Sequence, residues 1–274
     1  MVPAAARPSE SGARALLRAE ALEKRFGGIT ALADYSVSVG RGELLGLIGP
    51  NGAGKTTVFN LLSGVLKPTA GRILLGDRDI TAARPDRRAA LGIARTFQNI
   101  RLFAEMPVVD NIKVAFHMHR GRGLWPTLVH TPAFRRAERQ MAERAAEFLE
   151  LLGLQEVARE RAGNLPYGLQ RRVEIARALA ADPQLILLDE PAAGMNPNET
   201  DELIAVIERI HRRYGLAVFL VEHDMKVVMA SCDRIQVLDR GRVLCEGRPA
   251  DIRKDPRVIE AYLGTPRKGR RAGS

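Results

Sequence analysis

The chain has 274 residues, of which 46% are hydrophobic and 27% charged, so it can bury a sizeable core and is not an intrinsically disordered chain. Its net charge of +10 is spread along the sequence, which favours a solvated tail and arginine-rich helix faces over a specific nucleic-acid site. Two cysteines are too few for a disulfide framework and favour a reducing compartment, and no apolar run reaches the roughly twenty residues of a membrane-spanning helix.

The N-terminal part of the chain predicts a leader followed by strands. Residues 1–15 are rich in Ala, Pro and Ser without an apolar centre, which predicts a flexible leader and not a secretory signal. Alternating hydrophobicity over 16–26 and 35–39 predicts two strands around a turn at Gly27 and Gly28. Phe26 ends the first strand. An aromatic ring there could stack on a base, but the spacing alone favours a place in the core.

A glycine-rich segment, GPNGAGKTT, follows the apolar run 43–48 and precedes the amphipathic run 58–66. It fits the pattern G-x-x-x-x-G-K-[ST] between a predicted strand and a predicted helix, the context of a phosphate-binding loop. The glycines let several N–H groups converge, and the helix adds its positive end. Lys55 can then reach the outer phosphates, and the Thr56 hydroxyl can ligate magnesium. A chance strand-to-helix turn is the alternative. The candidate phosphate-binding residues are Gly49, Pro50, Asn51, Gly52, Ala53, Gly54, Lys55, Thr56 and Thr57.

Further strands are predicted over 71–76 and 93–97, and the second ends in Gln98. A polar residue directly after a sheet strand is placed to meet a ligand in the crevice at the strand ends, although by itself it is an ordinary loop glutamine. From residue 108 to about 181 the pattern changes to a helical period, over 109–116, 134–152 and 168–181. This change predicts a helical subdomain inserted at about 99–181.

A loop between the first two of these helices, residues 121–126, carries the only tryptophan, Trp125. It could contact a partner or fix its own loop. His117, His119 and His130 lie nearby without a carboxylate or cysteine beside them, so no metal site is expected there.

The apolar run 185–188 ends in two adjacent carboxylates, Asp189 and Glu190. Two acids after a buried strand are unfavourable for stability but useful for catalysis. One can hold magnesium, and the other can orient or deprotonate water. Capping of the following turn is the alternative. A helix is predicted over 197–213, then a strand over 216–222 that ends at His223, which could reach the same phosphate or be structural.

The C-terminal part predicts a hairpin, 234–238 with 242–246, and two short helices that end at Leu263. A basic tail follows over 265–274, with Arg267, Lys268, Arg270 and Arg271 as its charged cluster.

Taken in this order, the motifs resemble those of the ATPase subunits of ABC transporters. They are the phosphate loop, Gln98, the segment NLPYGLQRR at 164–172 (the signature segment), Asp189 with Glu190, and Glu222-His223-Asp224, and together they cover nearly the whole chain. A GTPase is disfavoured because no Asn-Lys-x-Asp motif is present. The resemblance implies an α/β fold over residues 16–264: a RecA-like P-loop core with a mainly parallel sheet, an N-terminal antiparallel β region and an inserted helical subdomain.

Within this class, the stretches 25–32, 95–103, 131–132, 191–197 and 260–264 are similar to the ATPases of branched-chain amino-acid importers. The resemblance implies hydrolysis of ATP with Mg²⁺ to drive import of a branched-chain or related amino acid. The implied partners are transmembrane permease subunits, a second ABC ATPase subunit and, indirectly, an extracytoplasmic solute-binding protein, with no specific nucleic acid. The implied location is peripheral, on the cytoplasmic face of the cell membrane. Urea or lipid transport, and a soluble nucleic-acid- or ribosome-associated ATPase, are the alternatives.

The resemblance also implies roles for single residues. Phe26 would stack on adenine, which reverses the preference from spacing, and Gln98 would lie near magnesium and the membrane subunit. Asp189 would hold magnesium, Glu190 would be the catalytic base, and His223 would contact the terminal phosphate. The catalytic candidates are thus Lys55, Gln98, Glu190 and His223, and the magnesium candidates are Thr56, Gln98 and Asp189.

The signature segment departs from its family. ABC ATPases work as head-to-tail pairs, and Gly168 would face the nucleotide of the partner from the start of a helix. The branched-chain group often reads L-A-Y-G-Q, whereas this chain has Pro166 and Leu169 at the second and fifth places. Pro166 brings neither a hydroxyl nor an N–H, and Met195 stands where the group usually has leucine.

Overall fold

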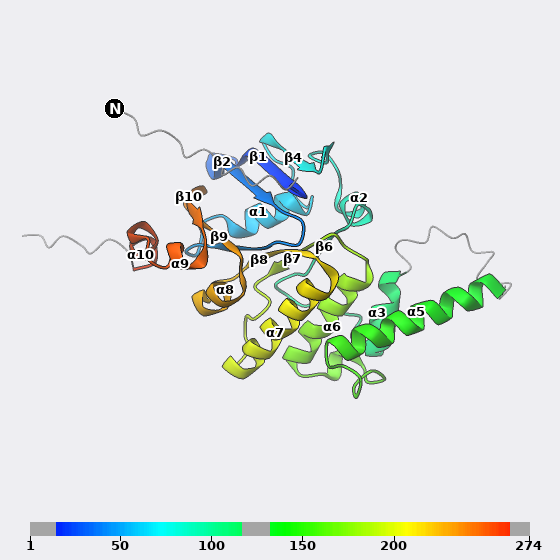
Figure 1. Ribbon diagram of the computed structural model, residues 1–274. Helices are drawn as coiled ribbons and strands as arrows, with labels where there is room; N and C mark the ends of the chain where they lie inside the picture. The colour runs from blue at the N-terminus through cyan, green and yellow to red at the C-terminus, as the bar shows by residue number, and fades with distance from the viewer. Residues whose placement is uncertain (1–14, 117–131, 264–274) are drawn as a thin grey trace, which may run out of the picture.

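The computed structural model describes residues 15–116 and 132–263 (Figure 1). Several predicted features therefore lie outside the described residues: nearly all of the leader, the loop with Trp125, the three histidines His117, His119 and His130, and the basic tail. Among the described residues, no helix is long and apolar enough to cross a membrane.

Two sheets form the framework. The smaller is antiparallel, in the order β2-β1-β4-β5, with β1 Leu17–Phe26, β2 Ile29–Val39, β4 Ala70–Leu75 and β5 Arg78–Asp79. The larger has the order β10-β9-β3-β8-β7-β6, with β3 Leu44–Ile48, β6 Ile93–Arg95, β7 Leu185–Asp189, β8 Ala217–Val221, β9 Arg234–Asp239 and β10 Arg242–Gly247. Its strands from β9 to β6 pair in parallel, and β10 joins β9 as an antiparallel hairpin. The predicted parallel core and antiparallel N-terminal region are confirmed.

The larger sheet is covered on both faces, which is why β3, β7 and β8 are buried along their whole length. Side chains alternate between the faces. Leu45, Leu187 and Phe219 pack toward the smaller sheet and α1 (Lys55–Leu62), which lies between the two sheets (Figure 1). Ile186 and Leu220 pack toward the helices on the opposite face.

The helices on that opposite face come from two parts of the chain (Figure 1). Those between β6 and β7 are α3 Val108–Phe116, α5 Pro132–Leu151, the 3₁₀ turn η2 Ala162–Asn164 and α6 Tyr167–Ala180. Those after β7 are α7 Pro197–Tyr214, α8 Met225–Ser231, α9 Pro249–Ile252 and α10 Pro256–Leu263. The first group occupies the predicted helical insert, whose domain limits stay a prediction.

Four short elements are absent from the sequence-based prediction: β5, α8, η2 and α2 (Pro85–Ala90). Helix α2 is too short to show a hydrophobic period, and a buried arginine explains its place. The guanidinium of Arg88 donates to the carbonyls of Leu61 and Leu62, at 2.6 and 2.7 Å, in the last turn of α1, where the Leu61 carbonyl also accepts from the amide of Gly64. It also donates to three carbonyls between β5 and α2, those of Ile80, Thr81 and Ala83.

We expect Arg88→Met to lower the free energy of unfolding by about 3 kcal/mol, because it leaves several buried carbonyls without a donor. Arg87→Met is the matched control, since Arg87 is the neighbouring residue of the same helix and is exposed. Urea unfolding followed by circular dichroism measures both. Equal stability of the two variants would show that Arg88 does not hold α1 and α2 together.

Candidate functional site

The phosphate loop joins β3 to α1, as predicted, and two of its glycines are required by close backbone contacts. Gly49 has φ +155°, and a Cβ there would lie 2.1 Å from the carbonyl oxygen of Leu238. Gly54 has φ +108°, and a Cβ there would lie 2.9 Å from the carbonyl oxygen of Ala31. The loop thus packs against β2 and the β9–β10 hairpin, which leaves no room for a side chain.

Lys55 is buried at the start of α1, and its ammonium folds back over the loop. Its Nζ donates to the carbonyl oxygens of Gly49, at 2.6 Å, and Pro50, at 3.1 Å. Burial lowers the pKa of Lys55, while the nearby carboxylates of Glu190 and Asp189 act in the opposite direction. The loop therefore holds the Lys55 ammonium beside two acids. Its hydrogen bonds go to backbone carbonyls, and phosphate oxygens can replace these carbonyls as acceptors.

Asp189, at the end of β7, is only 5% exposed and forms an ion pair with Arg95 at the end of β6. The distance from Arg95 Nη2 to Asp189 Oδ2 is 2.9 Å, and Arg95 Nη1 donates to Asn60 and Ser63 of the α1 region at 2.7 and 2.8 Å. The sequence prediction missed Arg95. Its place at the end of a strand next to β7 was the available signal, because parallel neighbours bring their carboxyl ends together.

Glu190 and Gln98 are in direct contact. Gln98 Nε2 donates to Glu190 Oε2 at 3.0 Å, across 92 residues of sequence. Glu190 has φ +45°, a left-handed conformation that is unfavourable for a side chain, and its amide donates to the carbonyl of Val221 in β8 at 2.9 Å. The strand ends therefore hold Glu190 in a strained conformation that turns its carboxylate toward Gln98.

A second functional candidate that the prediction missed is Glu222, which directly precedes His223. Its carboxylate is fully buried, and it accepts hydrogen bonds from the amides of Ala192, at 2.9 Å, and His223, at 3.3 Å. Burial raises the pKa of Glu222, the two amides and His223 lower it, and Glu190 raises it. The His223 ring itself is largely exposed, with Nδ1 3.7 Å from Glu222 Oε2. Glu222 therefore ties the loop after Glu190 to the strand end that carries His223.

Phe26 is not a core residue. Its side chain is 47% exposed at the tip of the β1–β2 hairpin, where it pairs with the exposed Ile29. The hairpin extends beyond the packed region, which explains why the interpretation from spacing is wrong. Lys24 Nζ lies 5.0 Å from the centre of the Phe26 ring. An exposed aromatic ring is compatible with base stacking, and that role stays a prediction.

Helix α6 begins inside the signature segment, at Tyr167, one residue before the predicted start at 168. Pro166 is the N-cap, with no side-chain cap hydrogen bond, and Gly168 lies in the first turn. A small pocket of about 90 Å³ beside this turn is lined by all three residues that depart from the family pattern, Pro166, Leu169 and Met195. The departures are thus neighbours in space, and they change one local surface.

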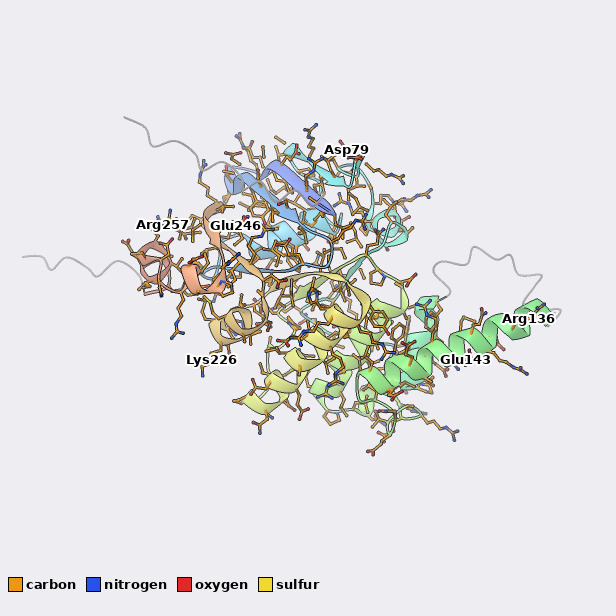
Figure 2. All side chains as sticks on the ribbon, viewed as in Figure 1. Asp79, Arg136, Glu143, Lys226, Glu246 and Arg257 are labelled. Atoms are coloured by element: carbon orange, nitrogen blue, oxygen red, sulfur yellow. The ribbon has the colours of Figure 1, made fainter. Side chains whose placement is uncertain are left out.

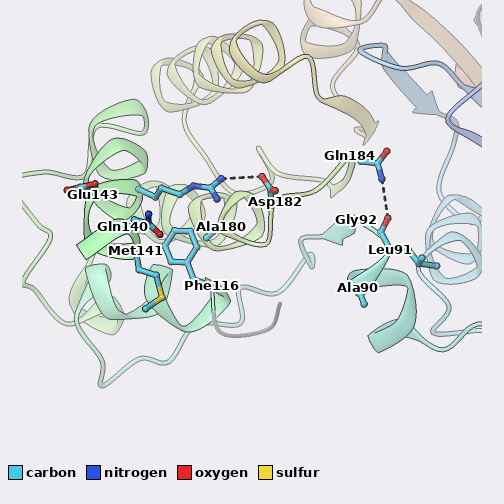
Figure 3. Close-up of a pocket in the computed structure, with 11 residues that line it drawn as sticks. Ala90, Leu91, Gly92, Phe116, Gln140, Met141, Glu143, Ala180, Asp182 and Gln184 are labelled. Carbon is cyan, nitrogen blue, oxygen red and sulfur yellow. Dashed lines mark hydrogen bonds and ion pairs between the residues drawn. The ribbon is translucent and has the colours of Figure 1, made fainter. Parts of the chain in front are cut away.

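The larger cleft in Figure 3, of about 620 Å³, lies away from these residues. It opens between α5, the end of α3 and the segments that lead into β6 and β7, where Arg144 pairs with Asp182 at 3.2 Å (Figure 3). Those segments lie at the amino ends of the strands. The predicted site residues lie at the carboxyl ends, so none of them lines this cleft.

The labelled residues Asp79, Glu143, Lys226 and Arg257, which carry charges of both signs, lie at different places around the molecule (Figure 2). This distribution agrees with solvated surfaces. Among the described residues there is no group of three or more His, Cys, Asp or Glu side chains that could hold a metal by themselves.

We expect Gly49→Ala to abolish binding of a nucleoside triphosphate, because its Cβ would force the first turn of the phosphate loop away from Leu238. Gly247→Ala in β10 is the control, since the nearest atom to a Cβ there is 3.7 Å away. A fluorescent ATP analogue measures affinity, and the melting temperature reports on folding. Unchanged affinity in Gly49→Ala would contradict the close packing of the loop.

The chain matches the family ABC transporter over residues 32–193 and the family Branched-chain amino acid ATP-binding cassette transporter over residues 242–267. It is 48% identical to the high-affinity branched-chain amino acid transport ATP-binding protein LivG of Escherichia coli (strain K12), over 91% of this chain and 98% of LivG. It is 47% identical to the corresponding protein BraF of Pseudomonas aeruginosa, over 92% of this chain and 98% of BraF.

Its fold is similar to the crystal structure of the ADP conformation of MJ1267, an ATP-binding cassette of an ABC transporter. The TM-score is 0.79, with 33% identity, over 92% of this chain and 99% of that one. The sequence families, the relatives and the fold all indicate the same class of protein. The chain therefore belongs to the ABC transporter family, as one of its ATP-hydrolysing, ATP-binding subunits.

Proposed function

We propose that this subunit powers the import of branched-chain or related amino acids from the cytoplasmic face of the cell membrane, through transmembrane permease subunits. The contact of Gln98 with Glu190 beside Lys55 supports hydrolysis at this site. The similarity to LivG and BraF over nearly their whole length supports the substrate class, as does the C-terminal match over residues 242–267. Lipid transport is less favoured because identity falls to 38% and 34% with the lipopolysaccharide export ATP-binding proteins LptB of Acidithiobacillus ferridurans and Escherichia coli, against 48% with LivG. Urea transport is the other alternative.

Glu190 is the proposed catalytic base. Its carboxylate is oriented by Gln98 on one side and by the bond of its own amide to β8 on the other. A carboxylate fixed in this way can orient the attacking water and take its proton. Gln98 then keeps the carboxylate pointing toward the terminal phosphate, which the exposed ring of His223 contacts.

Lys55 is the proposed partner of the outer phosphates. In this structure its ammonium is bound to the carbonyls of Gly49 and Pro50, so phosphate oxygens replace those two acceptors when ATP binds. The amides of the loop and the start of α1 bind the remaining charge. Phe26, exposed at its hairpin tip, stacks on the adenine.

Magnesium is the expected metal, and the residues present fit it. Thr56, Gln98 and Asp189 offer only oxygen ligands, the kind that Mg²⁺ prefers, and they would hold it together with phosphate oxygens and water. When bound, the ion neutralises charge on the phosphates. The carboxylate of Asp189 forms an ion pair with Arg95 in its buried position.

A second ATPase subunit, identical or different, is the proposed partner across the nucleotide. The N-terminal turn of α6 presents Gly168 and the positive end of the helix, and neither depends on the donors that Pro166 lacks. A solute-binding protein outside the cell is the indirect partner. No specific nucleic acid is proposed, because the net charge of +10 is spread along the sequence.

We expect Glu190→Gln to bind ATP with unchanged affinity, to lose at least about 100-fold in hydrolysis, and to accumulate as a dimer with ATP. Release of phosphate and size-exclusion chromatography measure these effects. Glu208→Gln, on the outer face of α7, is the control and should keep full activity. Normal turnover in Glu190→Gln would remove Glu190 as the base.

The substrate class has its own test. Cells whose chromosomal copy carries Glu190→Gln should lose most high-affinity uptake of labelled leucine, because the permease would no longer be driven. Loss of urea uptake with normal leucine uptake would instead identify the alternative substrate and contradict the proposal.

A further inference from the structure

A buried ion pair connects α6 to the Gln98 loop (residues 96–99). Arg171 is 0% exposed and Glu174 is 3% exposed, and the distance between Arg171 Nη1 and Glu174 Oε2 is 2.6 Å. Both residues lie on α6, one turn apart, directly after the turn that carries Gly168. Arg171 lies in the signature segment and Glu174 just after it, but neither residue has a role in the proposed site so far.

The pair holds the backbone of the Gln98 loop from both sides. The amide of Phe97 donates to Glu174 Oε1 at 3.2 Å, and the carbonyl of Phe97 accepts from Arg171 Nη1 at 2.6 Å. Arg171 Nη2 donates to the carbonyl of Gln98 at 2.8 Å. The loop residue whose side chain contacts Glu190 is therefore fixed through its main chain by α6.

The same guanidinium also holds the signature segment. Arg171 Nη2 lies 2.9 Å from the hydroxyl of Tyr167, the first residue of α6, so one side chain contacts both the Gln98 loop and the turn that carries Gly168. At the opposite, amino ends of the strands, the cleft of about 620 Å³ lies between α5 and the segment before β6 (Figure 3).

Stability alone does not account for this pair. Taking two charges out of water costs free energy that their attraction seldom exceeds, and an apolar pair of similar volume is often as stable. Burial raises the pKa of Glu174, and Arg171 together with the amide of Phe97 lowers it. What an apolar pair could not provide is the set of directed bonds to Phe97, Gln98 and Tyr167.

We propose that Arg171 and Glu174 are positioning residues that hold the Gln98 loop and the first turn of α6 as one unit. The proposal rests on the proposed function of Gln98 and Gly168 and deepens it. Gln98 acts on the nucleotide of its own subunit, and Gly168 faces the nucleotide of the partner. A shift of the Gln98 loop in one site is thereby passed to the segment that serves the other site.

The test compares Arg171→Gln, Arg171→Lys and Glu174→Gln with a control, Arg212→Gln, which removes an exposed arginine that pairs with Glu208 on α7. Two quantities are measured for each purified full-length chain. The first is hydrogen exchange of residues 96–99 without nucleotide, relative to residues 49–57. The second is the steady-state kcat and KM for ATP.

We expect Arg171→Gln and Glu174→Gln to speed exchange at residues 96–99 by about tenfold and to lower kcat by about tenfold, with KM within about twofold of the natural chain. Arg171→Lys keeps the charge but not the planar fork, so it should recover part of kcat. The control should change neither quantity.

Exchange at residues 96–99 equal to that of the control would overturn the proposal. A rise in KM as large as the fall in kcat, without recovery by Arg171→Lys, would also overturn it, because this result indicates general damage. If Arg171→Gln does not fold, Arg171→Lys and Glu174→Gln decide by the same criteria. Absence of ATPase activity in the natural chain would defeat the proposed function, whereas the exchange measurement would still decide whether the pair holds the loop.

Discussion

The double-sided burial of the parallel strands is the constraint on which the rest of the structure depends. Since β3, β7 and β8 are buried along their whole length, polar side chains are accommodated where these strands end. The order β3-β8-β7-β6 then places the phosphate loop, His223, the two acids and the residues after β6 along one edge. Parallel pairing makes all of these ends point the same way, which concentrates the chemistry there.

This concentration requires that charges be balanced in a place with little water. Asp189 is balanced by Arg95, and Lys55 by the carboxylates of Glu190 and Asp189 together with two carbonyls. Glu222 is bound by main-chain amides. A buried ion left alone would cost several kcal/mol, so these partners are a condition for the site and not additions to it. Each partner also restricts the direction of the group that it balances, and that restriction is what a catalytic site needs.

Local patterns in the sequence predicted most of the framework. The strands and helices follow from periodicity, and the phosphate loop, Asp189 and Glu190 follow from motifs at strand ends. The contacts that orient these groups could not be predicted in this way. Arg95 reaches Asp189 across 94 residues of sequence, and Arg171 reaches Phe97 across 74. Phe26 shows a limit of periodicity itself. Alternation along β1 does not tell where the hairpin extends beyond the core, so it could not predict that Phe26 is exposed.

The three departures from the family pattern, two in the signature segment and one at Met195, are best understood together. Pro166, Leu169 and Met195 line one pocket, so the three departures alter the same local surface. The groups that can act on a partner's phosphate are then the backbone of the first turn and the helix end, which Arg171 secures through Tyr167. In a pair of identical subunits both nucleotide sites would meet this altered surface, and in a mixed pair only one would. With a partner that keeps the family pattern, the proposed mixed pair would therefore have two chemically different sites.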